Sequence, residues 1–98
     1  MPLYKLIVTE IALTQLEESA LYYEDKQKNL GFEFEREIAD VLDIIENNPY
    51  LFPIKFAHFH EVVVNRFPYI IVYEIAGKEI VILSIFHTKQ DPEKKRKK

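Results

Sequence analysis

The spacing of apolar residues changes near the middle of the chain, and this change limits which folds are available to it. Up to about Asn48 the apolar residues recur at intervals of three and four, whereas from Ile54 onward they alternate or form short continuous runs. The first pattern is typical of amphipathic helices and the second of strands. Helices followed by strands indicate an α+β fold, in which the helices lie on one face of a mostly antiparallel sheet.

The first half of the chain predicts one strand and two helices. A strand is expected over residues 4–9, and Thr9 can cap a helix that runs from Glu10 to about Lys26. Residues 26–31 break the helical pattern and predict a short connection, which favours an antiparallel two-helix hairpin. The second helix should end at Pro49, because proline cannot continue the helical hydrogen bonds. This second helix has one continuous apolar stripe: Phe34, Ile38, Val41, Leu42 and Ile45.

The second half predicts strands over residues 60–67, 69–75 and 79–86, with a weaker strand over residues 54–59. Ala76-Gly77-Lys78 should form the tight turn of an antiparallel hairpin. The last two strands are so rich in apolar residues that we expect them in the middle of the sheet. With the N-terminal strand, the sheet then has four or five strands.

Charge is unevenly distributed along the chain, whose 98 residues suffice for one domain, expected over residues 1–90. Residues 1–88 contain seven Lys/Arg against fourteen Asp/Glu, and residues 89–98 contain six Lys/Arg against two acids. An acidic body argues against wide contact with nucleic-acid phosphates. Residues 91–98 are expected to form a basic flexible tail, which either attracts an acidic partner or nucleic acid or is simply solvated.

Several classes of protein are disfavoured by what the sequence lacks. It contains no cysteine, which excludes disulfides, thiolate zinc sites and a cysteine nucleophile and suits the cytoplasm. No apolar run approaches the roughly 20 residues that span a bilayer, so we expect no membrane contact.

His58 and His60, at i and i+2 of one expected strand, could bind zinc together with His87. Nothing in the sequence brings His87 near them, so neither a metal nor a cofactor is expected.

Stretches in a fixed order resemble the RelE/ParE superfamily of bacterial toxins, and in particular the ParE-like plasmid-stabilisation toxins. Residues 12–16 followed by Tyr22-Tyr23 resemble the opening helix of these toxins, and residues 30–34 followed by an acidic helix ending at Asn48-Pro49 resemble the second. The most specific stretch is residues 66–73, Arg-Phe-Pro-Tyr-Ile-Ile-Val-Tyr, followed at the family's spacing by residues 80–83 and 86–92. The likeness covers roughly residues 4–92.

The resemblance implies a compact RelE/ParE fold, a toxin of a type II toxin–antitoxin system and a cognate antitoxin protein as partner. RelE-like members cleave mRNA on the ribosome, whereas ParE-like members poison DNA gyrase. RNA cleavage needs cations at the scissile phosphate and a proton carrier. Where RelE-like proteins carry such cations on the central strands, this chain has Glu61, Val63 and Ile70, and only Lys89 keeps a basic position. We therefore expect a ParE-like gyrase inhibitor and not an enzyme, with an mRNA endonuclease or a non-toxic antitoxin-binding module as alternatives.

Candidate site residues follow from these readings. If the chain is a nuclease, Arg66, His87 and Lys89 are the catalytic candidates; alternatively, Arg66 forms a structural ion pair and His87 hydrogen-bonds locally. Tyr22, Tyr23, Tyr69 and Tyr73 are either stacking platforms for bases or core residues, and the core is favoured. A homodimer is a further alternative, since a small domain with many aromatic residues can bury some of them against a second copy. The antitoxin could bind at an uncovered strand edge or at the helical hairpin. The residues expected to contact a partner are Arg66, Tyr69, Lys89, Lys94, Lys95 and Arg96.

Overall fold

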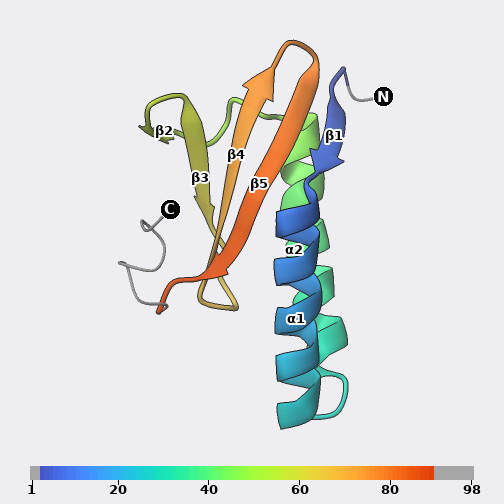
Figure 1. The fold of residues 1–98 in the computed structure, drawn as a ribbon. Coiled ribbons are helices and arrows are strands. Elements are labelled where there is room, and N and C mark those ends of the chain that lie inside the picture. Colours follow the sequence, from blue (N-terminus) through green and yellow to red (C-terminus); the bar gives the residue numbers. More distant parts are fainter. Residues whose placement is uncertain (1–2, 90–98) are drawn as a thin grey trace.

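The computed structural model describes residues 3–89, which form two helices and one five-stranded sheet (Figure 1). The predicted α+β class is confirmed, and the sheet is mostly antiparallel. The elements in chain order are β1 (Lys5–Val8), α1 (Glu10–Lys26), α2 (Leu30–Asn47), β2 (Ile54–Phe56), β3 (Phe59–Val63), β4 (Tyr69–Ala76) and β5 (Glu79–His87).

The strands lie in the order β1-β5-β4-β3-β2. β1 pairs with β5 in parallel, and every other pair is antiparallel. The two apolar strands β4 and β5 are therefore internal, as expected, because each needs a neighbour on both sides to satisfy its backbone hydrogen bonds. β1 and β2 form the two edges.

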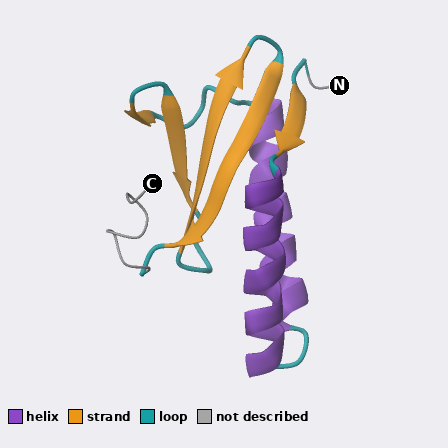
Figure 2. Cartoon of the chain, in the orientation of Figure 1, coloured by secondary structure: helices purple, strands orange, loops and turns teal. Residues whose placement is uncertain are grey.

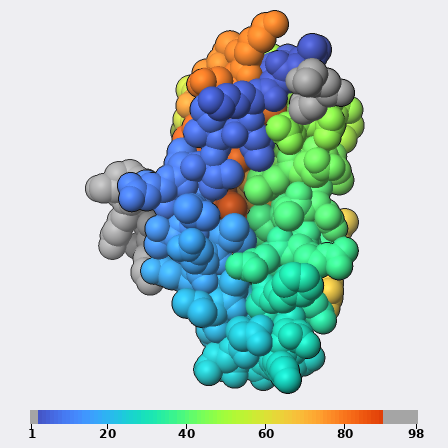
Figure 3. All heavy atoms as spheres, turned by 90° about the vertical axis from the view of Figure 1, so that its right-hand side faces the viewer, coloured from blue at the N-terminus to red at the C-terminus, as the bar shows by residue number. Residues whose placement is uncertain are grey.

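The helices form the expected hairpin, which packs beside β1 and β5 and extends past one end of the sheet (Figures 1 and 2). Seen from outside the hairpin, α1 and α2 lie side by side (Figure 3). Thr9 caps α1 as predicted: its Oγ1 accepts the Ala12 N–H at 3.2 Å and donates to the Ile82 carbonyl at 2.8 Å. The cap thereby ties the start of α1 to β5.

The connection between the helices is shorter than the sequence indicates, since α2 begins at Leu30. Asn29 adopts a left-handed conformation with φ of 72° and supplies no side-chain cap. Instead, the Glu24 carboxylate accepts the backbone N–H groups of Asn29 at 2.9 Å and Gly31 at 3.0 Å. Gly31 also permits the close approach of the helices, because a Cβ there would lie 2.4 Å from the Ala20 carbonyl oxygen.

Two strands end three or more residues earlier than the sequence predicts. The weak strand ends at Phe56, because a turn with Ala57 at φ 52° redirects the chain into β3. β3 ends at Val63, well before Phe67, because the Val64 N–H bonds to the Tyr69 carbonyl and closes a loop. This loop turns Phe67 into the core, where it is 5% exposed.

The core lies between the helical hairpin and one face of the sheet. Along β4, Tyr69, Ile71 and Tyr73 are buried, while the alternate side chains are partly exposed, as expected for a strand covered on one face. From the helical stripe, Phe34, Ile38 and Ile45 are fully buried. Phe34 and Tyr23 join Phe67 and Tyr69 in an aromatic cluster whose ring centroids are 4.8–6.2 Å apart.

Candidate functional site

The residues in the described range that the sequence predicted to bind or catalyse gather at one end of the sheet. Tyr69, the first residue of β4, pairs with His87, the last residue of β5. The Thr88 N–H donates to the Pro68 carbonyl at 2.6 Å, which holds the β3–β4 loop against the segment after β5. The loop that contains Arg66 and the segment that contains Lys89 are thus neighbours.

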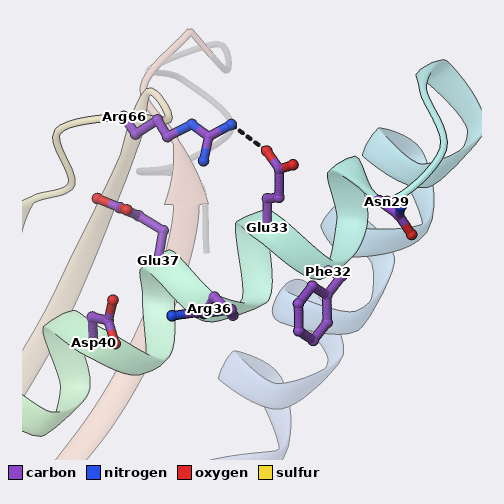
Figure 4. A pocket seen from close by; sticks show the side chains of 7 residues that line it. All are labelled: Asn29, Phe32, Glu33, Arg36, Glu37, Asp40 and Arg66. Carbon is purple, nitrogen blue, oxygen red and sulfur yellow. Dashed lines mark hydrogen bonds and ion pairs between the residues drawn. The ribbon is translucent and has the colours of Figure 1, made fainter.

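Arg66 points away from that segment and toward α2. Its guanidinium donates to the Glu33 carboxylate, and it also lies 5.2 Å from the centre of the Phe67 ring. Arg66 lines a hollow of about 510 Å³ whose other walls come from α2 and its N-cap, Asn29; Glu37 and Asp40 are among them (Figure 4). The lining also includes Arg36, so three carboxylates stand with two guanidinium groups in this hollow, and the Arg66 charge is already paired with one of the carboxylates. The structural interpretation of Arg66 as the partner of a helix carboxylate is the one that the geometry favours.

Tyr69 and His87 have little freedom to bind a partner. Tyr69 is 4% exposed, and its hydroxyl donates to Ser19 Oγ at 2.8 Å. The His87 ring lies 5.2 Å from the Tyr69 ring, and its Nδ1 accepts the backbone N–H of Lys89 at 2.9 Å. Nδ1 therefore carries no proton in this arrangement. Of the predicted residues at this end of the sheet, Lys89 is exposed and forms no side-chain bond within residues 3–89.

The central strands of the sheet carry no positive charge on the face turned away from the helices. Val63 pairs with Ile70, and Glu61 pairs with Val72, so these four side chains lie on the face opposite to the buried Val62 and Ile71. The described strands β3, β4 and β5 contain no Lys or Arg at all. A phosphorane developing over these three strands would meet carboxylates and hydrocarbon, and the strands would not stabilise it.

The three histidines do not come together, and the prediction that His58 and His60 share a face is wrong. His58 lies in the turn before β3 and bonds through Nε2 to Glu74 at 2.7 Å. His60 is buried, bonds through Nδ1 to the Phe52 carbonyl at 2.7 Å and stacks on Tyr73. Glu74 and Tyr73 are consecutive in β4 and point to opposite faces. Among residues 3–89, no group of three or more His, Cys, Asp or Glu side chains could hold a metal ion.

The tyrosines divide between core and surface. The core interpretation is confirmed for Tyr73, whose hydroxyl donates to the Pro49 carbonyl at 2.6 Å, and for Tyr69. Burial raises the pKa of Tyr73 to about 12, and burial together with the nearby Tyr69 raises that of Tyr23 to about 12. Tyr22 differs, because its side chain is exposed and packs edge-on against Tyr23.

Lys94, Lys95 and Arg96, the basic residues expected to contact a partner, lie outside the described residues. Within residues 3–89, neither helix is apolar enough over its length to cross a membrane.

Two residues with structural roles at this site were missed by reasoning from sequence. Glu33 is the partner of Arg66, but it stands in a helix with several exposed acids, and nothing local distinguishes it from Glu35 or Glu37. Gln15 on α1 bridges a register shift in β5: its Oε1 accepts the Ile85 N–H at 2.7 Å and the Ser84 hydroxyl at 3.2 Å. Neither contact could be predicted from the spacing of residues along the chain, because each joins residues that are far apart in sequence.

The fold defines the class, a small α+β domain with a two-helix hairpin on a mostly antiparallel sheet, and comparison with known proteins specifies the family. The profile described as "ParE toxin of type II toxin-antitoxin system, parDE" matches residues 6–92, nearly the whole chain, and the chain belongs to this family. Comparison with curated protein sequences found no match. A solved chain titled "Chromosomal ParDE TA system from P. aeruginosa" has a similar fold, with a TM-score of 0.66 and 17% identity. The match covers 89% of this chain and 98% of that one.

Proposed function

We propose that this member of the ParE toxin family is held inactive by a cognate antitoxin and acts on a cytoplasmic target protein such as DNA gyrase. It acts by direct contact and does not cleave RNA. One observation carries this proposal: the strands that would have to hold a scissile phosphate contain no Lys or Arg. A nuclease needs preorganised cations where negative charge develops, and Glu61 on β3 would oppose it.

The arrangement of the candidate catalytic residues supports the same conclusion. Arg66 is paired with Glu33 and turned toward α2, so it does not converge with His87. His87 keeps one nitrogen that can carry a proton, Nε2, and the cation that follows it in the chain is Lys89, since the Arg66 charge is paired with Glu33. A lone exposed lysine and a histidine lack the charge that the reaction requires.

The test is expression of the chain in a bacterial host, with and without the protein encoded next to it. We expect growth arrest, DNA damage and loss of supercoiling by purified gyrase, and we expect rescue by the neighbouring protein. Replacing His87 by Ala should leave the growth arrest unchanged. If the chain were a nuclease, the same change would lower activity on the order of 10²–10⁴-fold, because a proton carrier would be lost.

Two outcomes would contradict the proposal. Ribosome-dependent mRNA cleavage with gyrase unaffected would establish the nuclease. Normal growth at high expression, together with tight binding of the neighbouring protein, would establish a non-toxic antitoxin-binding module.

A further inference from the structure

The segment that joins α2 to β3 exposes apolar side chains at one edge of the sheet. β2, which belongs to this segment, is the last strand in the order β1-β5-β4-β3-β2, and Figure 1 shows it on the side of the sheet away from the helices. We call residues 50–56 the edge arm. Four of its side chains are more than half exposed: Tyr50 at 66%, Leu51 at 57%, Ile54 at 55% and Phe56 at 70%.

Both sides of β2 are apolar. Ile54 pairs with the buried His60 and therefore points to the same side of the sheet as that ring. Phe56 pairs with Phe59, which points to the opposite side, and the two phenyl rings stack with centroids 6.1 Å apart. A strand that is apolar on both sides normally lies inside a sheet. Since β2 has a neighbour on one side alone, its apolar side chains exceed what a solvent-exposed edge needs.

The edge arm also differs in charge from the acidic body of the chain. Residues 47–60 contain no Asp or Glu. Lys55 stands between the two apolar side chains of β2, is exposed and forms no ion pair among the described residues. The acids of the two nearest strands, β3 and β4, are Glu61 and Glu74, and Glu74 is already bonded to His58 at 2.7 Å. The arm therefore offers apolar anchors together with one available cation.

The size of the exposed surface distinguishes between kinds of partner. An aromatic side chain has an area of about 150–250 Å², so the four exposed side chains of the edge arm present roughly 400 Å² of apolar surface. A standard interface takes about 800 Å² from each partner, and permanent complexes take more. The edge arm is thus too small to form a stable dimer, or to hold an antitoxin by itself. It is large enough for the energetic centre of a transient contact.

Charge disfavours a second copy as well. If β2 paired with β2 of another copy across a two-fold axis, Ile54 would lie opposite Phe56 and the two Lys55 side chains opposite each other. Like charges placed directly opposite in a sheet are destabilising. The occupant is therefore a different protein, which offers a carboxylate where a second copy offers an ammonium group.

We propose that the edge arm is the surface with which the toxin contacts its target protein. This inference rests on the proposed function, inhibition by direct contact, and adds the contacting residues and the chemistry of the partner. Phe56 and Ile54 are the anchors that enter an apolar depression on the target, and Lys55 pairs with an Asp or Glu at its rim. Aromatic anchors inside a polar rim carry most of the binding energy of protein interfaces.

The experiment compares variants of the full chain for growth arrest at matched cellular levels and for inhibition of purified gyrase. Phe56→Ser should abolish the arrest and raise the half-inhibitory concentration at least about tenfold, because an anchor is lost. The matched control is Phe32→Ser, which removes the same type of side chain from a position 59% exposed on α2 and should leave both readouts unchanged. Far-UV circular dichroism and thermal unfolding report whether each variant is folded. If Phe56→Ser is not, Ile54→Ser takes its place with the same expected result.

A change of charge tests the stated chemistry of the partner. Lys55→Glu should weaken inhibition about tenfold, because it places a carboxylate against an acidic rim, whereas Lys55→Arg should retain inhibition. The control Lys78→Glu changes the net charge equally at an exposed position in the β4–β5 turn and should also retain it.

The outcomes separate this inference from the proposed function. If the unmodified chain neither arrests growth nor inhibits gyrase, the proposed function is wrong and the inference falls with it. If the unmodified chain is active and a folded Phe56→Ser is equally active, or Lys55→Glu behaves like Lys78→Glu, the inference alone is overturned. It is also overturned if Phe56→Ser stays toxic but loses binding of the neighbouring protein or loses self-association, because the occupant is then the antitoxin or a second copy.

Discussion

The two faces of the same helical hairpin put apolar residues to different uses. On the inner face, Phe34 and Ile38 are fully buried and contact the aromatic cluster and the sheet. On the outer face, Phe32 and Leu21 are more than half exposed and line a hollow between α1 and α2. A side chain stabilises a fold only by the apolar area that it removes from water. The inner residues therefore support folding, whereas the outer residues remain available to a partner.

The sharpest test of this contrast replaces, one at a time, two phenylalanines that are two residues apart in α2. Phe34→Ala should lower the free energy of unfolding by about 3–5 kcal/mol, because it leaves a cavity in the aromatic cluster. Phe32→Ala should change it by no more than about 0.5 kcal/mol, because Phe32 is 59% exposed. Urea denaturation of both variants provides the measurement. Equal destabilisation would mean that the outer face is also part of the core.

A second prediction concerns the inner face at alkaline pH, where the raised pKa values of its tyrosines make the stability of the fold depend on pH. The pKa of Tyr73 is about 12 in the folded chain, against an ordinary value of 10.0. The unfolded chain then loses its proton first as the pH rises, so stability is complete below pH 10 and declines between pH 10 and 12. The decline should be about 1.4 kcal/mol per pH unit for each such tyrosine, and Tyr23 should add to it because its pKa is raised likewise.

Tyr73→Phe checks the origin of this decline. The variant should be less stable at pH 8 by about 1–3 kcal/mol, because the buried Pro49 carbonyl loses its donor. Its loss of stability between pH 10 and 12 should nevertheless be shallower than that of the unmodified chain in the same denaturation series. An unchanged slope would show that other groups cause the alkaline sensitivity.

The smallest effect is expected for the ion pair between the sheet end and α2. The side chains of Arg66 and Glu33 are 54% and 39% exposed, and a pair so accessible to solvent contributes about 0.2–1 kcal/mol. A double-mutant cycle with Arg66→Gln and Glu33→Gln should give a coupling energy in this range that decreases with salt. Toxicity that is lost with Arg66→Gln and kept with Glu33→Gln would instead identify Arg66 as a direct contact of the target.

Reasoning from sequence succeeded where the signal is local and periodic. The period of the apolar residues predicted both helices and the two internal strands, and Thr9 was recognisable as a cap because it precedes a helical stripe and Glu10. It failed where the chain needs a distant partner. Asn29 begins α2 without a cap of its own because Glu24 supplies one from the preceding helix. His58 and His60 were misplaced because a turn, not a continuous strand, separates their faces.

The sequence alone determined the fold class, the order of elements, the acidic body and the scarcity of cations on the central strands, since these depend on composition and short-range spacing. The tertiary structure alone decided that β1 lies parallel to β5, that Arg66 pairs with Glu33, and that Glu17 and Leu21 of α1 line one hollow together with Glu35 of α2. The physical reason is that a helix or strand depends on neighbours within a few residues. Which carboxylate meets which cation, and which apolar row stays uncovered, depend on how whole elements pack.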